Sequence, residues 1–141
     1  MANATTTASG SVMAIAASAL RAQQARMRVI AENIANSDST AKSSEAEPYR
    51  RQAAVFEPAR VGQGAEGVRI ARVVPDQSAF KLEYSPGHPA ANKDGYVKLP
   101  NVDPLIEALD MKEAQRAYEA NLNVIETARS MQARTLDLLK R

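Results

Sequence analysis

Apolar residues recur at helical spacing in the first flank of the chain. Over residues 11–36 the apolar side chains are three or four residues apart, with one polar interruption at Gln23: Met13, Ala16, Leu20, Met27, Ile30 and Ile34. This spacing places side chains on one face of an α-helix, so we expect a helix over residues 11–36. Residues 1–10 are uncharged and of low complexity, which predicts a flexible tail.

The last flank carries the same pattern. Asp103 is a favourable N-cap residue and Pro104 suits the first helical position, so a helix is expected over residues 104–141. Its predicted seam contains Met111, Ala114, Tyr118, Asn121, Leu122, Ile125 and Ala128, a second line contains Val124, Met131 and Leu138, and Leu136 and Leu139 broaden the stripe. Such a helix would be about 55 Å long at roughly 1.5 Å per residue and needs a partner helix. The two flanks could pair within one chain, or present a surface to other subunits.

Between the flanks the hydrophobic period changes from helix to strand. All seven prolines fall between Pro48 and Pro104. Alternating patterns at residues 68–73, 80–84 and 96–99 predict strands, and residues 49–56 form a weaker candidate that ends before Pro58. We therefore predict an α+β fold. Long N- and C-terminal helices (residues 11–36 and 104–141) pair as a coiled-coil-like inner domain, and residues 37–103 form an extended loop and a small β-rich module between them.

Composition argues against several classes of function. The net charge is +2 without a dense basic stripe, so nucleic acid is not an expected partner. There is no cysteine, and His88 is the single histidine, placed in a turn between Gly87 and Pro89. Hence we expect no catalytic residue, no metal site, no cofactor and no small-molecule substrate. No apolar run is long enough for a membrane span. Residues 11–20 look like a signal-peptide core, but the first ten residues lack basic charge, so we expect mature helix.

Two motifs at opposite ends of the chain resemble one family. Ala-Glu-Asn-Ile-Ala-Asn at residues 31–36 resembles the signature near the start of flagellar rod, hook and related axial proteins, through Asn33, Ile34, Ala35 and Asn36. Residues 113–121 resemble the C-terminal signature of that family, through Gln115, Arg116, Ala117, Tyr118 and Asn121. Segments at residues 74–78, 84–89 and 95–104 are similar to those of proximal-rod members, whereas residues 37–49 depart from the family pattern.

The resemblance implies a structural subunit of the flagellar basal-body rod in the periplasm. It implies polymerisation into a hollow drive shaft with other copies and other rod proteins, and export by the flagellar type III apparatus without a cleaved signal peptide. It also implies an inner domain made by the terminal helices, with Asn33 and Asn36 fixing the turn after the first helix. One alternative is a coiled-coil adaptor or chaperone of a type III secretion system that forms a discrete oligomer. A small periplasmic hydrolase is a weaker alternative, since only scattered carboxylates could serve it.

Overall fold

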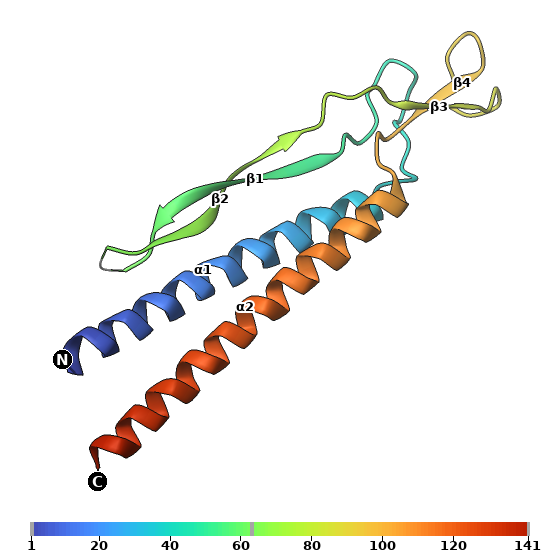
Figure 1. The fold of residues 1–141 in the computed structure, drawn as a ribbon. Coiled ribbons are helices and arrows are strands. Elements are labelled where there is room, and N and C mark those ends of the chain that lie inside the picture. The colour runs from blue at the N-terminus through green and yellow to red at the C-terminus, as the bar shows by residue number, and fades with distance from the viewer. Residues whose placement is uncertain (1, 63, 141) are drawn as a thin grey trace.

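Two long antiparallel helices form the frame of the molecule (Figure 1). The computed structural model describes residues 2–62 and 64–140. Helix α1 spans Ala2–Ala35 and helix α2 spans Pro104–Leu139, and the two pack together so that both chain termini lie at one end. The Asp103 side chain accepts a hydrogen bond from the Leu105 N–H at 3.0 Å, and Pro104 opens α2. The predicted N-cap and first helical residue are confirmed.

Helix α1 begins at Ala2, where the sequence pattern placed its start at Ser11. The added segment contains no proline, and its only glycine is Gly10. Extending an existing helix adds one backbone hydrogen bond per residue without the cost of a new nucleus, which accounts for the longer helix. The flexibility of residues 1–10 remains a prediction, and residue 1 lies outside the described residues.

A long β-hairpin lies along α1, and α1 separates it from α2 (Figure 1). Its strands are β1 (Gln52–Arg60) and β2 (Glu66–Pro75), paired antiparallel with an irregularity between Val55 and Phe56. Strand β1 continues through Pro58, so the prediction that this strand ends before the proline was wrong. A two-stranded sheet leaves one edge of every strand unpaired, and a proline at such an edge removes no ladder hydrogen bond.

The hairpin packs tightly against α1 at a glycine. A Cβ atom added at Gly67 would lie 2.2 Å from the Oγ of Ser18. The Ser18 hydroxyl accepts a hydrogen bond from the Val68 N–H at 3.1 Å and donates one to the Ile15 carbonyl at 2.7 Å. Because these bonds hold the hydroxyl in place, only glycine fits opposite it without a shift of the hairpin.

A second, shorter antiparallel pair lies beyond the helix ends. It consists of β3 (Lys81–Tyr84) and β4 (Tyr96–Leu99), and it forms a separate two-stranded sheet. The segment after β2 therefore connects two different sheets. The predicted α+β class, with small antiparallel sheets inserted between long terminal helices, is confirmed.

The buried apolar core is thin and is built mainly from alanine. Its members are Ala16, Ala22, Ile30, Ala65, Ala90, Val97, Val102, Ala114 and Ala128. Alanine at the helix contact brings the two backbones close but removes little apolar area from water. The helix pair therefore gains limited stability from its own contact.

Candidate assembly site

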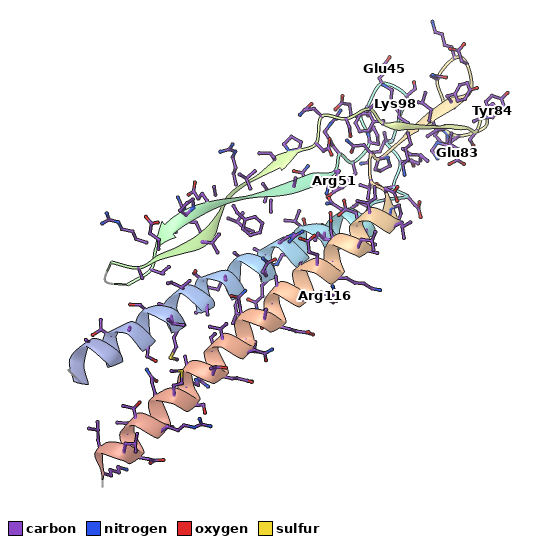
Figure 2. The ribbon with its side chains drawn as sticks, viewed as in Figure 1. Glu45, Arg51, Glu83, Tyr84, Lys98 and Arg116 are labelled. Carbon is purple, nitrogen blue, oxygen red and sulfur yellow. The ribbon has the colours of Figure 1, made fainter. Side chains whose placement is uncertain are left out.

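A polar network joins the C-terminal end of α1 to the N-terminal end of α2. Glu107 on α2 is fully buried, and its carboxylate accepts a short hydrogen bond from Nε of Arg51, which precedes β1. Figure 2 shows Arg51 between the start of β1 and the helix pair. Nη1 of Arg51 lies 3.5 Å from Asp76, and Nη2 lies 3.5 Å from Asp110. A buried carboxylate requires such a partner, because an unpaired charge in the interior is very costly.

Asn33 connects α1 to the same network. Its amide nitrogen donates hydrogen bonds to the Gln52 carbonyl at 2.8 Å and to Glu107 at 3.3 Å. Its amide oxygen accepts from the Gln52 N–H at 2.9 Å and from the Tyr49 hydroxyl at 2.7 Å. The amide of Asn33 thus pairs with the peptide group at the start of β1 as a neighbouring strand would. Asn33 is completely buried, and its bond to Glu107 is buried as well, whereas Tyr49 and Gln52 are half-buried.

Asn101 and Asp76 bring in the two sheets. The Asn101 amide oxygen accepts from the Arg51 N–H at 2.7 Å, and its nitrogen donates to the carbonyls of Asp76 and Ser78 at 3.0 and 3.1 Å. Asn101 follows β4 and Asp76 follows β2. We call Asn33, Tyr49, Arg51, Asp76, Asn101 and Glu107 the polar junction. It fixes the relative position of both helices and both sheets at one place.

The ionisable groups of the junction are shifted in the directions that this arrangement dictates. Burial opposes the charge of Arg51, but the hydrogen bond and the charge of Glu107 raise its pKa. Hydrogen bonds from the backbone and side chain of Ser78 lower the pKa of Asp76, with help from Arg51. Burial of the Tyr49 hydroxyl, near the negative charges of Glu32 and Glu107, raises its pKa. The three shifts favour a charged Arg51, a charged Asp76 and a neutral Tyr49, which suits a structural role.

Comparison with known proteins gives the family. The family described as "Flagella basal body rod protein" matches residues 13–41, and the family "Flagellar basal body rod FlgEFG protein C-terminal" matches residues 93–138. The flagellar basal-body rod protein FlgC of Agrobacterium fabrum is 48% identical over 128 residues, which cover 89% of this chain and 91% of that protein. FlgC of Salmonella typhimurium is 45% identical over 125 residues (88% and 92%), and FlgC of Bacillus subtilis is 37% identical over 142 residues (89% and 95%).

The chain belongs to the FlgC family of flagellar basal-body rod proteins. It is a structural rod subunit and not an enzyme, and the resemblance inferred from the two terminal motifs is confirmed. Within residues 2–62 and 64–140, neither helix has a stretch that is apolar enough to cross a bilayer.

The predicted helix seam of this FlgC-family chain is buried at some positions and exposed at others along its length. Ala16, Ile30, Ala114 and Ala128 are buried, and Met13, Leu20, Met27, Met111, Tyr118 and Ile125 are half-buried. In contrast, Ile34 (36%), Leu122 (39%), Leu136 (60%) and Leu139 (68%) are exposed. These four are the least covered apolar positions of the seam in the single chain. Their part in assembly remains a prediction.

The family-motif residues divide between the junction and the surface. Asn33 lies in the polar junction and bonds to a strand far along the chain, whereas the side chain of Asn36, just after α1, donates to the Glu32 carbonyl in the last turn of that helix at 2.8 Å. Asn121 also bonds within its helix, to the Ala117 carbonyl at 2.7 Å. Several motif residues are exposed in the single chain: Ile34, Ala35, Gln115 and Arg116. Tyr118 and Ala117 are half-buried.

Sequence reasoning missed most of the junction. It did not single out Glu107, which is fully buried. A signal was present, because Glu107 lies four residues before Met111 and therefore continues the seam of α2. A carboxylate on an apolar seam calls for a cationic partner. The sequence alone does not say that this partner is Arg51, since the pair is 56 residues apart.

Proposed function

We propose that this chain assembles with further copies of itself and with other rod proteins into a hollow shaft that transmits torque and conducts exported subunits. The observation that carries the proposal is the row of apolar side chains that the single chain leaves uncovered on both helices. On α1 these include Val12 (44% exposed) and Ile15 (39%), and on α2 they include Leu136 and Leu139. Covering such residues by neighbouring subunits would stabilise an assembly.

The proposal gives the two parts of the molecule separate tasks. The helix pair supplies the inner polymerisation domain, and the module of residues 37–103 lies outside it. The polar junction supports this division because it holds both sheets to the helix ends through several bonds at once. A subunit that transmits torque needs such a connection, since a single flexible link would turn without carrying load.

We also propose that the subunit reaches the periplasm through the flagellar type III apparatus without losing residues 13–20. In the structure these residues form part of α1, where Ala16 and Ser18 are buried. The Ser18 hydroxyl also bonds to Val68 of the hairpin. Removal of this segment would take away the part of α1 on which the hairpin rests.

Replacing an exposed apolar residue of α1 tests the assembly proposal. Ile15→Asp should leave the isolated subunit folded but block rod formation and swimming, because a charge would enter an interface between subunits. Gln24→Asp, at another exposed position of α1, is the matched control and should support swimming. Ile30 is less suitable, since it is 4% exposed and its replacement would disturb folding.

Basal bodies from cells with the wild-type chain provide the second readout. Mass spectrometry of the intact subunit should give the full length, and a chain that starts near Leu20 would contradict export without cleavage. Normal rods with Ile15→Asp would contradict a role for this face of α1. A discrete oligomer in the cytoplasm, absent from basal bodies, would favour the adaptor or chaperone instead.

A further inference from the structure

The turn that leads into β4 contains the one Asp–Gly dipeptide of the chain, Asp94–Gly95. The segment between β3 and β4 lies at the end of the molecule farthest from both chain termini, and Asp94 is exposed there (Figure 1). In such a dipeptide the backbone nitrogen of the glycine can reach the aspartate side chain, because glycine has no Cβ that would hinder the approach. The turn therefore holds the groups for a spontaneous change of its own backbone.

This reaction has two steps. The backbone nitrogen of Gly95 forms a bond to Cγ of Asp94, and the carboxyl hydroxyl leaves with the amide hydrogen as water, which closes a succinimide ring. Water then opens the ring at either of its two carbonyl groups. Opening at one carbonyl restores aspartate, and opening at the other gives isoaspartate, in which the main chain runs through Cβ and Cγ. One water is released and one is consumed, so the reaction needs no oxidant, cofactor or enzyme.

The folded turn holds the atoms that this reaction must move. The Gly95 N–H donates to the Asn92 carbonyl at 3.0 Å, and the Gly95 carbonyl accepts from the Ser85 N–H at 2.9 Å. Oδ1 of Asn92 accepts from the Asp94 N–H at 3.0 Å and from the Tyr96 N–H at 2.9 Å. Asn92 thus binds three successive N–H groups, as asparagine commonly does in turns. The Gly95 nitrogen cannot turn toward the Asp94 carboxyl group until these bonds break.

We propose that Asp94 is a site of spontaneous isoaspartate formation, and that Asn92 controls the rate of this modification by holding the turn closed. The reaction then proceeds only in molecules whose turn has opened, either locally or because the whole chain is unfolded. Isoaspartate at position 94 accordingly records the time that a chain has spent with this turn open. The inference concerns the isolated chain and does not rest on the proposed function.

The surroundings of Gly95 show what the modification would disturb. Gly95 is buried and has a φ of +86°, and a Cβ atom added there would lie 2.9 Å from a ring carbon of Tyr84 and 3.1 Å from Pro86. The rings of Tyr84 and Tyr96 meet edge to face, with centroids 5.3 Å apart, and Figure 2 labels Tyr84 at this end of the molecule. A main chain with an extra carbon does not fit this space, so isoaspartate should open the β3–β4 pair.

Peptide mapping measures the rates that test this proposal. Isolated subunits are kept folded at one fixed pH and temperature, and isoaspartate is identified by fragmentation at the extra main-chain carbon. Asn92→Ala should form isoaspartate about tenfold faster than the wild type, because the bonds to the N–H groups of Asp94 and Tyr96 are lost. Asn92 is exposed, so this variant should fold. Asn92→Asp keeps an acceptor oxygen and should stay close to the wild-type rate. In urea all three chains should react equally fast, and faster than any folded chain.

Gly67→Ala separates local opening of the turn from unfolding of the whole chain. It disturbs the contact between the hairpin and α1, far from the turn, and should leave the rate at Asp94 unchanged. A Gly67→Ala rate as high as that of Asn92→Ala, or an Asn92→Ala rate equal to the wild type, would overturn the role of Asn92. Equal rates for the folded and the urea-unfolded wild type would overturn protection by the turn. Unfolded chains without isoaspartate at position 94 would overturn the site itself.

Discussion

The two ends of the helix pair are stabilised by different chemistry. At the end that holds the polar junction, Asn33 and Glu107 are completely buried and their polar atoms are bonded to other parts of the same chain. At the opposite end, where both termini lie, Met131 and Leu138 are more than half exposed. The buried polar groups of the junction end are satisfied within one subunit, although apolar side chains at the start of α2, such as Leu105 (70%), are exposed there as well. The opposite end, which we call the open end, has exposed apolar side chains and none of the junction residues.

This difference shows how a small chain can be rigid in one place and ready to assemble in another. Buried hydrogen-bonded networks fix a geometry because each group loses its partner if the geometry changes. Uncovered apolar side chains contribute little to an isolated chain, yet they gain free energy when a neighbour removes them from water. In this subunit the network holds the sheets to the helices, while the open end would depend on assembly for its stability.

Removing the buried carboxylate is the strongest test of the difference between the two ends, and it has the largest expected effect. Glu107→Ala should lower the free energy of unfolding by about 3 kcal/mol, near the lower limit for a broken buried ion pair, because Arg51 keeps two other carboxylate partners. Urea unfolding of the isolated subunit measures this change in the free energy of unfolding. Glu113→Ala is the control: this glutamate also pairs with an arginine, Arg26 at 3.5 Å, but is 71% exposed. Its loss should cost below about 1 kcal/mol. Equal effects of the two variants would show that the junction does not stabilise the subunit.

The sequence predicted those features that depend on residues close together in the chain, and it missed those that depend on contacts between distant segments. The helices were found because their apolar spacing and the Asp103 cap are local signals. The strands beside Val68, Leu82 and Tyr96 were found in the same way, from alternation over a few residues. Pairing was not predicted, since no local pattern says that β2 pairs with β1 and β3 with β4. The junction was missed for the same reason, because Asn33, Arg51 and Glu107 come from three distant segments.

A substitution at the contact between the hairpin and α1 should have an effect of intermediate size on stability. Gly67→Ala should destabilise the subunit by about 1–3 kcal/mol, the usual cost of forcing extra atoms into a packed site. The reason is the Ser18 hydroxyl, 2.2 Å from the added Cβ and held by two hydrogen bonds. Gly87→Ala is the matched control, because a Cβ there meets nothing within 4 Å. Thermal unfolding of both variants compares them, and an unchanged midpoint for Gly67→Ala would show that the hairpin can move away from α1 at little cost.

The smallest expected effect is a loss of folding stability at low pH. It tests whether charge as well as hydrogen bonding stabilises the junction. The pKa of Asp76 in the folded chain is lowered, chiefly by hydrogen bonds from Ser78 and further by Arg51. A carboxylate whose pKa is lower in the folded than in the unfolded state contributes stability above its unfolded pKa of about 4, and this contribution is lost as the pH falls through the folded value. Urea unfolding of the wild type should therefore show a loss of stability below about pH 4 that is shallower in Asp76→Asn. Asp94→Asn, in the exposed turn before β4, is the matched control and should follow the wild type. Identical profiles for the wild type and Asp76→Asn would mean that the Asp76 charge adds nothing, and that the junction end differs from the open end through its hydrogen bonds and the Arg51–Glu107 pair.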